Sequence, residues 1–134
     1  MPYLERDDPR HADLPLLAAH LNDLRAGRPV DAPVWSFFTH RRESSRPLHP
    51  APLIVVEGIH ALEPAVRSHL DLAVYVDAPA VIRLQRIEAR ERAGERGWTI
   101  DHVREHFRDV AEPAFNARAP AYRAAADVIV TNPS

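Results

Sequence analysis

Hydrophobic and polar positions follow two patterns along this chain, and each pattern predicts a different kind of element. Leucines recur at helical spacing over residues 14–24, where Asp13 can serve as the N-cap and Gly27 can end the helix. Residues 53–56 and 72–76 are short runs that are apolar on both faces, which is typical of buried parallel strands. The alternation of helices and strands therefore predicts an α/β fold with a parallel sheet.

The other expected elements are shorter or less regular. Thr99 can cap a helix whose apolar face includes Phe107, and Pro113 and Pro120 are expected to interrupt the chain beyond that helix. The connection between the two buried runs is long enough for a crossover helix. The further elements are a strand over 34–38, helices over 63–70 and 79–92, and a last strand over 128–130.

The composition narrows the classes of function. The chain has 134 residues, a formal net charge of −2 and no cysteine, which excludes a disulfide scaffold and thiolate chemistry. Its 17 basic residues are all arginine, so this sequence holds no lysine for a Schiff base, a general base or a phosphate-binding P-loop. The absence of a long apolar run predicts no membrane partner, and the charge balance predicts no nucleic-acid partner. We therefore expect a cytoplasmic protein.

Glu57 directly follows the first buried run and precedes Gly58. Ligands of open α/β sheets bind beyond the carboxyl ends of the strands, and an acid there can hold Mg²⁺ directly or through water. A carboxylate that caps the next helix would occupy the same position, so the local pattern leaves both interpretations open.

Arginines are concentrated on and just after the predicted helix over residues 79–92. Arg83, Arg86 and Arg90 form one stripe on it, and Arg96 follows in a loop that contains glycine. Guanidinium groups match phosphate oxygens, so such a stripe suits a lid that grips a phosphate. By itself, however, the stripe is more typical of an ordinary solvated helix face.

Histidines and paired aspartates supply further candidates. His102 and His106 are four residues apart without the glutamate of a zinc helix, so a solvated face is the favoured interpretation. His40 closely follows Trp35, and an aromatic wall with one polar tip could hold a planar base or merely anchor a loop. The two aspartates before Pro9 could bind sugar hydroxyls or form a solvated turn.

The order of these features resembles the uridine kinase and phosphoribulokinase family of P-loop phosphotransferases, and the similarity extends over nearly the whole chain. Its most specific parts are residues 33–40 and the motif around Glu57, with support from the arginine helix. The resemblance implies a P-loop NTPase-like three-layer α/β/α fold with a parallel sheet. It also implies one partial domain over residues 1–134, whose N-terminal strands are missing.

The resemblance further implies roles for individual residues. Asp7 corresponds to the aspartate that binds the nucleoside ribose, with Asp8 as the alternative, and Trp35 and His40 correspond to the side chains that hold the base. Glu57 resembles the acid associated with Mg²⁺. The side chains that resemble lid arginines closing on the phosphates of ATP or GTP are Arg86, Arg90 and Arg96. The implied acceptor is a small uncharged substrate such as uridine or cytidine, which is phosphorylated at its primary hydroxyl. The implied partners of the chain also include further copies of itself, in a homo-oligomer.

This sequence also departs from the family pattern. The P-loop and the aspartate that serves as general base are not among its residues, so no catalytic residue of the family lies in this chain. Ser36 replaces the usual aspartate of an aromatic-Asp pair, and Ile87 and Trp98 stand where nucleoside kinases often have arginine. We expect a truncated or inactive portion of a kinase, in which the two buried runs lack a shared neighbouring strand. The alternatives are an inactive nucleoside-binding or regulatory module and, less favoured, an arginine-rich RNA-binding module.

Overall fold

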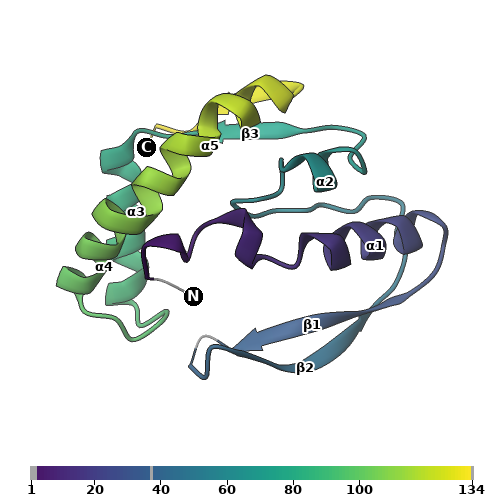
Figure 1. Ribbon diagram of the computed structural model, residues 1–134, viewed down its shortest axis with the longest axis horizontal. Helices are drawn as coiled ribbons and strands as arrows, with labels where there is room; N and C mark the ends of the chain where they lie inside the picture. The colour runs from purple at the N-terminus through teal and green to yellow at the C-terminus, as the bar shows by residue number, and fades with distance from the viewer. Residues whose placement is uncertain (1–2, 37, 134) are drawn as a thin grey trace. The chain divides into compact units, whose positions relative to one another are not determined.

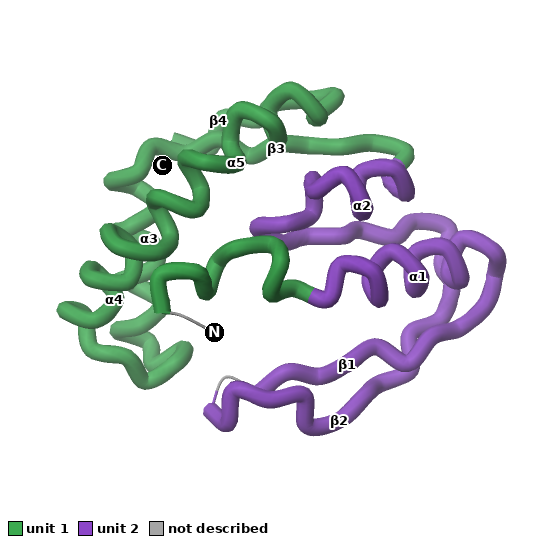
Figure 2. The backbone as a smooth tube through the Cα atoms, viewed as in Figure 1, with its two compact units in different colours: residues 1–12, 71–134 green, residues 13–70 purple. Residues whose placement is uncertain are grey.

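The chain forms two compact units in the computed structural model, which describes residues 3–36 and 38–133. Unit 1 comprises Met1–Ala12 and Asp71–Ser134, and unit 2 comprises Asp13–Leu70; Figure 2 colours them green and purple. The single partial domain expected over residues 1–134 stays a prediction.

Unit 2 begins with the first helix that the leucine spacing predicts. Helix α1 spans Leu14–Arg25, and the Asp13 carboxylate accepts the N–H of Leu16 at 3.2 Å, which confirms Asp13 as the N-cap. Gly27 follows the helix with a φ of +80°, a left-handed conformation that glycine adopts without steric cost. Helix α1 lies against the short helix α2, Pro64–Arg67, which confirms part of the helix expected over 63–70.

An antiparallel hairpin forms the rest of the regular structure of unit 2 (Figure 1). Strand β1, Val30–Ser36, pairs with β2, Arg41–Leu48, with a bulge after Val34. The observed strand β1 therefore begins before the strand expected over 34–38 and ends at Ser36, and Phe37 lies outside the described residues. The partner strand of β1 was not expected from the sequence pattern. Polar residues fill β2, which explains why a search for apolar runs missed it.

The strand expected over residues 53–57 is wrong, and with it the crossover expected after it. These residues form no regular element and are mostly exposed, with Leu53 at 79% and Val55 at 78%, and no described strand pairs with them. A strand exists only when a neighbouring backbone accepts and donates its hydrogen bonds. The apolar run provides the side chains of a buried strand, but the described chain provides no partner for its backbone.

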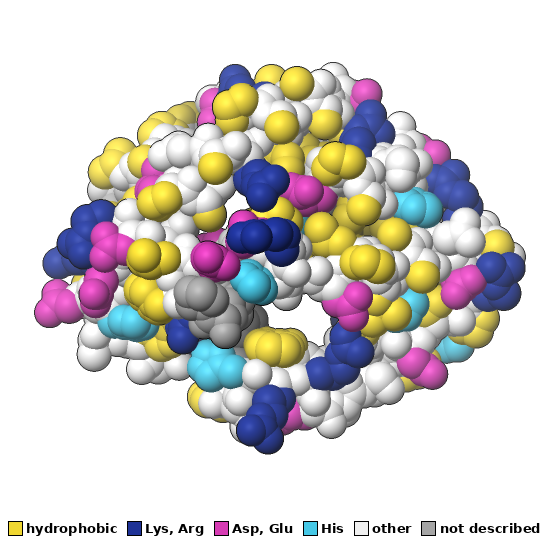
Figure 3. All heavy atoms as spheres, viewed as in Figure 1, with side chains coloured by type: hydrophobic (Ala, Val, Ile, Leu, Met, Phe, Trp, Pro, Cys, Tyr) yellow, Lys and Arg dark blue, Asp and Glu magenta, His cyan; other side chains and the backbone are white. Residues whose placement is uncertain are grey.

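Unit 1 contains a two-stranded parallel sheet. Strand β3, Val74–Asp77, pairs with β4, Val128–Thr131, so that Val74 lies opposite Val128. This pairing confirms an α/β fold with a parallel sheet. The sheet leaves apolar side chains accessible, and hydrophobic groups reach the surface on the face drawn in Figure 3. The accessible side chains of the two strands are Val74, Val76, Val128, Ile129 and Val130.

Three helices connect β3 to β4; the sequence predicts the first two and not the third. Helix α3 spans Ala80–Arg92, α4 spans Ile100–His106, and α5 spans Glu112–Ala125. The Thr99 hydroxyl accepts the N–H of His102 at 3.2 Å, which confirms Thr99 as the N-cap of α4. The core of unit 1 is formed by apolar side chains of β3 and the residues beside it, of α4 and α5, and of the turn that joins these two helices. They include Ala73, Tyr75, Ala78, Val103, Phe107, Val110, Ala119 and Tyr122.

The expected interruption at two prolines is wrong, because the chain remains helical through both. Pro113 occupies the first turn of α5, where a missing N–H costs little. Pro120 lies inside α5 beside the buried residues Ala119 and Tyr122, so packing of this face holds the helix together despite one lost backbone hydrogen bond. A π-helical turn, Phe107–Ala111, joins α4 to α5. Among the described residues, no helix is long and apolar enough to span a membrane.

Candidate functional site

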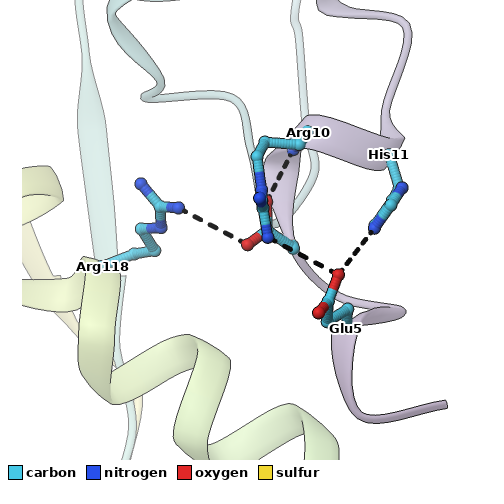
Figure 4. A network of polar contacts seen from close by, with 5 residues as sticks. Glu5, Arg10, His11 and Arg118 are labelled. Carbon is cyan, nitrogen blue, oxygen red and sulfur yellow. Dashed lines mark hydrogen bonds and ion pairs between the residues drawn. The ribbon is translucent and has the colours of Figure 1, made fainter. Parts of the chain in front are cut away.

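Asp8 contacts Arg10 and Arg118, which belong with Glu5 and His11 to a local polar network that includes the start of unit 1 (Figure 4). Its Oδ1 accepts the backbone N–H of Arg10 at 2.8 Å and the Nε–H of Arg10 at 2.9 Å, which caps a short 3₁₀ helix. Its Oδ2 lies 3.8 Å from the guanidinium of Arg118. The hydrogen bonds from Arg10 lower the pKa of Asp8 from 3.8 to about 2, so this carboxylate is charged and engaged in holding its own segment.

Asp7 has a different environment, although it is the adjacent residue. Its Oδ2 lies 3.8 Å from Nε2 of His106 on α4, and its side chain is 26% exposed. That distance exceeds a hydrogen bond, so the carboxylate can turn to accept the hydroxyl of a ligand. Of the two candidate aspartates, Asp7 is therefore the one whose geometry suits a binding role.

An aromatic cluster surrounds the imidazole that faces Asp7. The ring of His106 meets Trp98 edge-on at a centroid distance of 5.2 Å and Tyr3 at 5.8 Å. Trp98 also meets His102 at 4.6 Å. Within the described part of the chain, the Tyr3 hydroxyl and Nδ1 of His106 are both buried without a hydrogen-bond partner.

The solvated face expected for His102 and His106 is wrong for His106, whose side chain is only 13% exposed. Burial lowers the pKa of His106 below its ordinary value of 6.5, and the nearby Arg96 adds to the effect. The Asp7 carboxylate opposes the shift without overcoming it. At neutral pH the imidazole is therefore uncharged, and its burial needs no counterion.

This buried imidazole makes the stability of unit 1 depend on pH. Because the pKa is lower in the folded than in the unfolded state, the unfolded state binds more protons below pH 6.5. Stability is complete above that pH and is lost as the pH falls through the folded pKa. We expect the free energy of unfolding to decrease as the pH falls below about 6.5, and His106→Gln to flatten this slope.

Urea denaturation at a series of pH values measures this slope. His49→Gln, which removes an exposed histidine of unit 2, is the matched control and should leave the slope unchanged. Equal slopes in the wild type and in His106→Gln would contradict the assignment.

The four candidate arginines of α3 and the loop after it have different surroundings. Arg83 has a structural role, whereas the other three lie at the surface of the helix or in the loop. Arg83 donates to the carbonyl of Ala78 at 3.0 Å, pairs with Glu112, and stacks on the ring of Phe115 at 4.0 Å. Arg83 therefore joins α3 to α5. Arg86 donates to the carbonyl of Asn132 at 3.2 Å.

Arg90 and Arg96 lie at the loop between α3 and α4. The Arg90 Nε is 3.2 Å from the Glu95 carboxylate, and both side chains are well exposed. The Arg96 guanidinium lies over the ring of Trp98 at 5.1 Å. Arg96 thus connects this loop to the aromatic cluster beside Asp7.

Glu91 is a residue of this site that the sequence analysis missed. Its side chain is 1% exposed, and its Oε2 accepts the backbone N–H groups of Arg96 at 3.3 Å and Trp98 at 3.2 Å. The available signal was its spacing, since Leu84, Glu88 and Glu91 follow the heptad rhythm of one buried helix face. A carboxylate on such a face needs polar partners, which the loop supplies.

The remaining predicted residues lie in unit 2. Trp35 is 56% exposed on β1. His40 is in the turn between the strands with a left-handed φ of 53°, and its N–H donates to the carbonyl of Ser36 at 2.9 Å. Glu57 is exposed and precedes Gly58. Asp7, Asp8 and the predicted lid arginines therefore belong to unit 1, where contacts through His106 and Trp98 link Asp7 to Arg96, and Trp35, His40 and Glu57 belong to the other unit.

The carboxylates of this chain suit a Mg²⁺ ion that takes most of its ligands from phosphate and water rather than from side chains. No group of three or more potential ligands surrounds a common point in the described residues, so a cage built from side chains alone is not formed there. Mg²⁺ typically takes one or two carboxylates and completes its shell with phosphate oxygens and water. An accessible carboxylate such as that of Glu57 fits that mode of binding.

Comparison with known proteins agrees with these features. The family model described as "Phosphoribulokinase / Uridine kinase family" matches residues 3–133. A uridine kinase of Shewanella pealeana is 36% identical over 92% of this chain and 59% of its own length. A uridine kinase of Clostridium perfringens is 35% identical over 92% of this chain and 60% of its own length.

A plant protein shows the same similarity within a longer chain. The uridine kinase-like protein 5 of Arabidopsis thaliana is 33% identical over 92% of this chain and 27% of its own length. The present chain thus spans about 60% of the length of the bacterial uridine kinases that it matches. Since the family model covers nearly every residue, this chain belongs to the phosphoribulokinase/uridine kinase family.

Proposed function

We propose that this chain carries the acceptor-binding and lid portion of a nucleoside kinase, which transfers a phosphoryl group from ATP or GTP to the primary hydroxyl of a nucleoside such as uridine or cytidine. Asp7 accepts hydroxyl groups of the ribose, while Trp35 and His40 contact the base. Asp8, which holds Arg10, supports the segment that presents Asp7. Arg86, Arg90 and Arg96 hold phosphate oxygens of the nucleotide.

The observation that carries this proposal is a continuous line of contacts in unit 1. It starts at the Asp7 carboxylate, passes through the His106 ring at 3.8 Å and Trp98 at 5.2 Å, and ends at the Arg96 guanidinium, 5.1 Å from the Trp98 ring. A group that accepts hydroxyl protons and a group that binds phosphate oxygens thus belong to one side-chain cluster. Phosphoryl transfer needs that combination, because it depends on positioning of the acceptor and on stabilisation of phosphate charge.

Charge on the transferred phosphoryl group calls for cations. Guanidinium groups donate in a planar fork to phosphate oxygens, and Arg90 is exposed enough to exchange Glu95 for a phosphate. Mg²⁺, with Glu57 as a carboxylate near it, would neutralise charge on the nucleotide phosphates when bound. A phosphate-cradling lysine is not among these 134 residues, nor is the family's general base. The chain by itself is therefore expected to bind better than it catalyses.

Binding and turnover assays on the purified chain test this proposal. We expect calorimetry to show that uridine or cytidine binds, and a radiolabelled phosphate-transfer assay to show product close to background, because the phosphate cradle and the base are not in this chain. Robust phosphorylation by this chain would contradict the expected inactivity. Absence of any nucleoside binding would contradict the acceptor site.

An inactive nucleoside-binding or regulatory module is the second candidate, favoured by the complete absence of lysine from the sequence. The same titrations separate the two. Binding of ATP as well as nucleoside supports the kinase portion, because the lid arginines then hold phosphates. Binding of nucleoside without ATP supports the regulatory module.

A further inference from the structure

The loop between α3 and α4 is held by two different sets of hydrogen-bond acceptors. Its first half is held by backbone carbonyls of the helix end, where the N–H of Gly94 donates to Glu91 at 2.8 Å and the N–H of Glu95 donates to Arg90 at 3.2 Å. Its second half is held by the Glu91 side chain, which accepts from Arg96 and Trp98. The conformation of the second half therefore depends on a single carboxylate.

The backbone of Gly97 explains how two N–H groups reach one oxygen. Gly97 has a φ of +76°, so the chain reverses between its two neighbours, and both of their N–H groups converge on Oε2 of Glu91. N–H groups arranged in this way form a concave site for an anion. In this protein the anion is a buried carboxylate from the preceding helix rather than a ligand.

The same carboxylate lies close to the side chain that the loop carries. Oε1 of Glu91 is 3.8 Å from Nε of Arg96, and the Arg96 side chain is 27% exposed. The guanidinium thus lies between the Glu91 carboxylate, at ion-pair rather than hydrogen-bond distance, and the Trp98 ring. One side chain holds the backbone that bears Arg96 by hydrogen bonds and places a negative charge beside the guanidinium.

We propose that Glu91 is a positioning residue, which shapes the second half of this loop and thereby directs Arg96 toward a bound phosphate. The proposal rests on the proposed function for the role of Arg96, but the shaping of the loop is a property of the free chain. Loss of the acceptor releases two N–H groups and lets the loop sample other conformations. Retention of a neutral acceptor keeps the loop in place.

Three variants of the full chain test this role. Glu91→Ala removes the acceptor, Glu91→Gln retains a carbonyl oxygen that can accept both N–H groups, and Glu105→Ala removes an exposed carboxylate from α4 with the same change in charge. Amide hydrogen exchange at Arg96 and Trp98 is measured in each by nuclear magnetic resonance. Binding of inorganic tripolyphosphate is measured by calorimetry.

We expect Glu91→Ala to speed amide exchange at both positions by about tenfold or more, and Glu91→Gln and Glu105→Ala to stay within about twofold of the wild type. We also expect tripolyphosphate affinity to fall in Glu91→Ala and to be rescued in Glu91→Gln, which a general loss of stability would not produce. Slow exchange in Glu91→Ala, or equally fast exchange in Glu91→Gln, would overturn the proposal, and the Glu91→Gln result decides the case even if Glu91→Ala does not fold.

The two proposals fail in different ways. If the wild type does not bind tripolyphosphate, the phosphate-gripping lid of the proposed function is contradicted together with the directing of Arg96. The exchange rates would then still support Glu91 as the residue that shapes the loop. If the wild type binds and Glu91→Ala binds equally well, the lid stands and the positioning role of Glu91 is overturned.

Discussion

Replacement of Asp7 by asparagine is expected to weaken uridine binding by about 10- to 100-fold, because a hydrogen bond to a charged acceptor contributes more than one to a neutral amide. The Asp7 carboxylate lies 3.8 Å from the His106 imidazole, which is uncharged at neutral pH and so does not neutralise it. An amide presents one acceptor oxygen in place of two, and its N–H₂ group can donate but cannot accept a hydroxyl proton. Calorimetric titration with uridine measures the loss.

The control for this substitution is Asp101→Asn, which makes the same chemical change at an exposed position of α4. Asp8→Asn is unsuitable, because it removes the charge that pairs with the guanidinium groups of Arg10 and Arg118. A second measurement shows that the variant is folded with its site intact. Since Asp7 raises the pKa of His106, its removal should lower that pKa further, as followed by imidazole resonances. Unchanged uridine affinity with a lowered His106 pKa would contradict the role of Asp7.

The sequence predicts those parts of the fold that depend on local chemistry. Asp13 and Thr99 cap their helices because a short acceptor side chain satisfies N–H groups a few residues away, and both contacts are formed. Helix α3 starts and ends within one residue of its expected range. The parallel pair of β3 and β4 follows from the apolar runs over residues 72–76 and 128–130, which helices separate.

Elements that depend on distant partners could not be predicted in the same way. Residues 53–57 have the side chains of a buried strand, but pairing is a property of two segments, and the pattern of one segment does not reveal whether the other is present. Strand β2 shows the opposite case. Its residues are polar and do not predict a strand, but pairing with β1 makes it one.

The candidate site shows the same division. The resemblance to the family identified Asp7 and Arg96 as candidate site residues. The two are far apart in the sequence, and no pattern predicted that His106 and Trp98 would connect them. The histidine spacing alone predicts a solvated face. It does not reveal that Tyr3, which is far away in the sequence, covers His106. The spacing of Glu91 indicates a buried helix face, but its partners are backbone N–H groups, which no residue type in the sequence identifies.

Phe107→Ala is expected to lower the free energy of unfolding by about 3–5 kcal/mol, the largest stability effect predicted for this chain. Phe107 is 9% exposed and begins the π-helical turn between α4 and α5. The Arg83 guanidinium lies 5.8 Å from its ring, and Arg83 itself ties α3 to α5. Loss of the ring therefore leaves a cavity where three helices depend on one another, and a loss of this size is a large fraction of the stability of a small domain.

Phe38→Ala is the matched control, because it deletes the same ring at a position that is 84% exposed. It should change the free energy of unfolding by less than about 0.5 kcal/mol. Urea denaturation followed by circular dichroism measures both variants against the wild type. If Phe107→Ala proved as stable as Phe38→Ala, then the π-helical turn would not be fixed by its buried ring, and the backbone of α4 and α5 would have to hold that geometry without it.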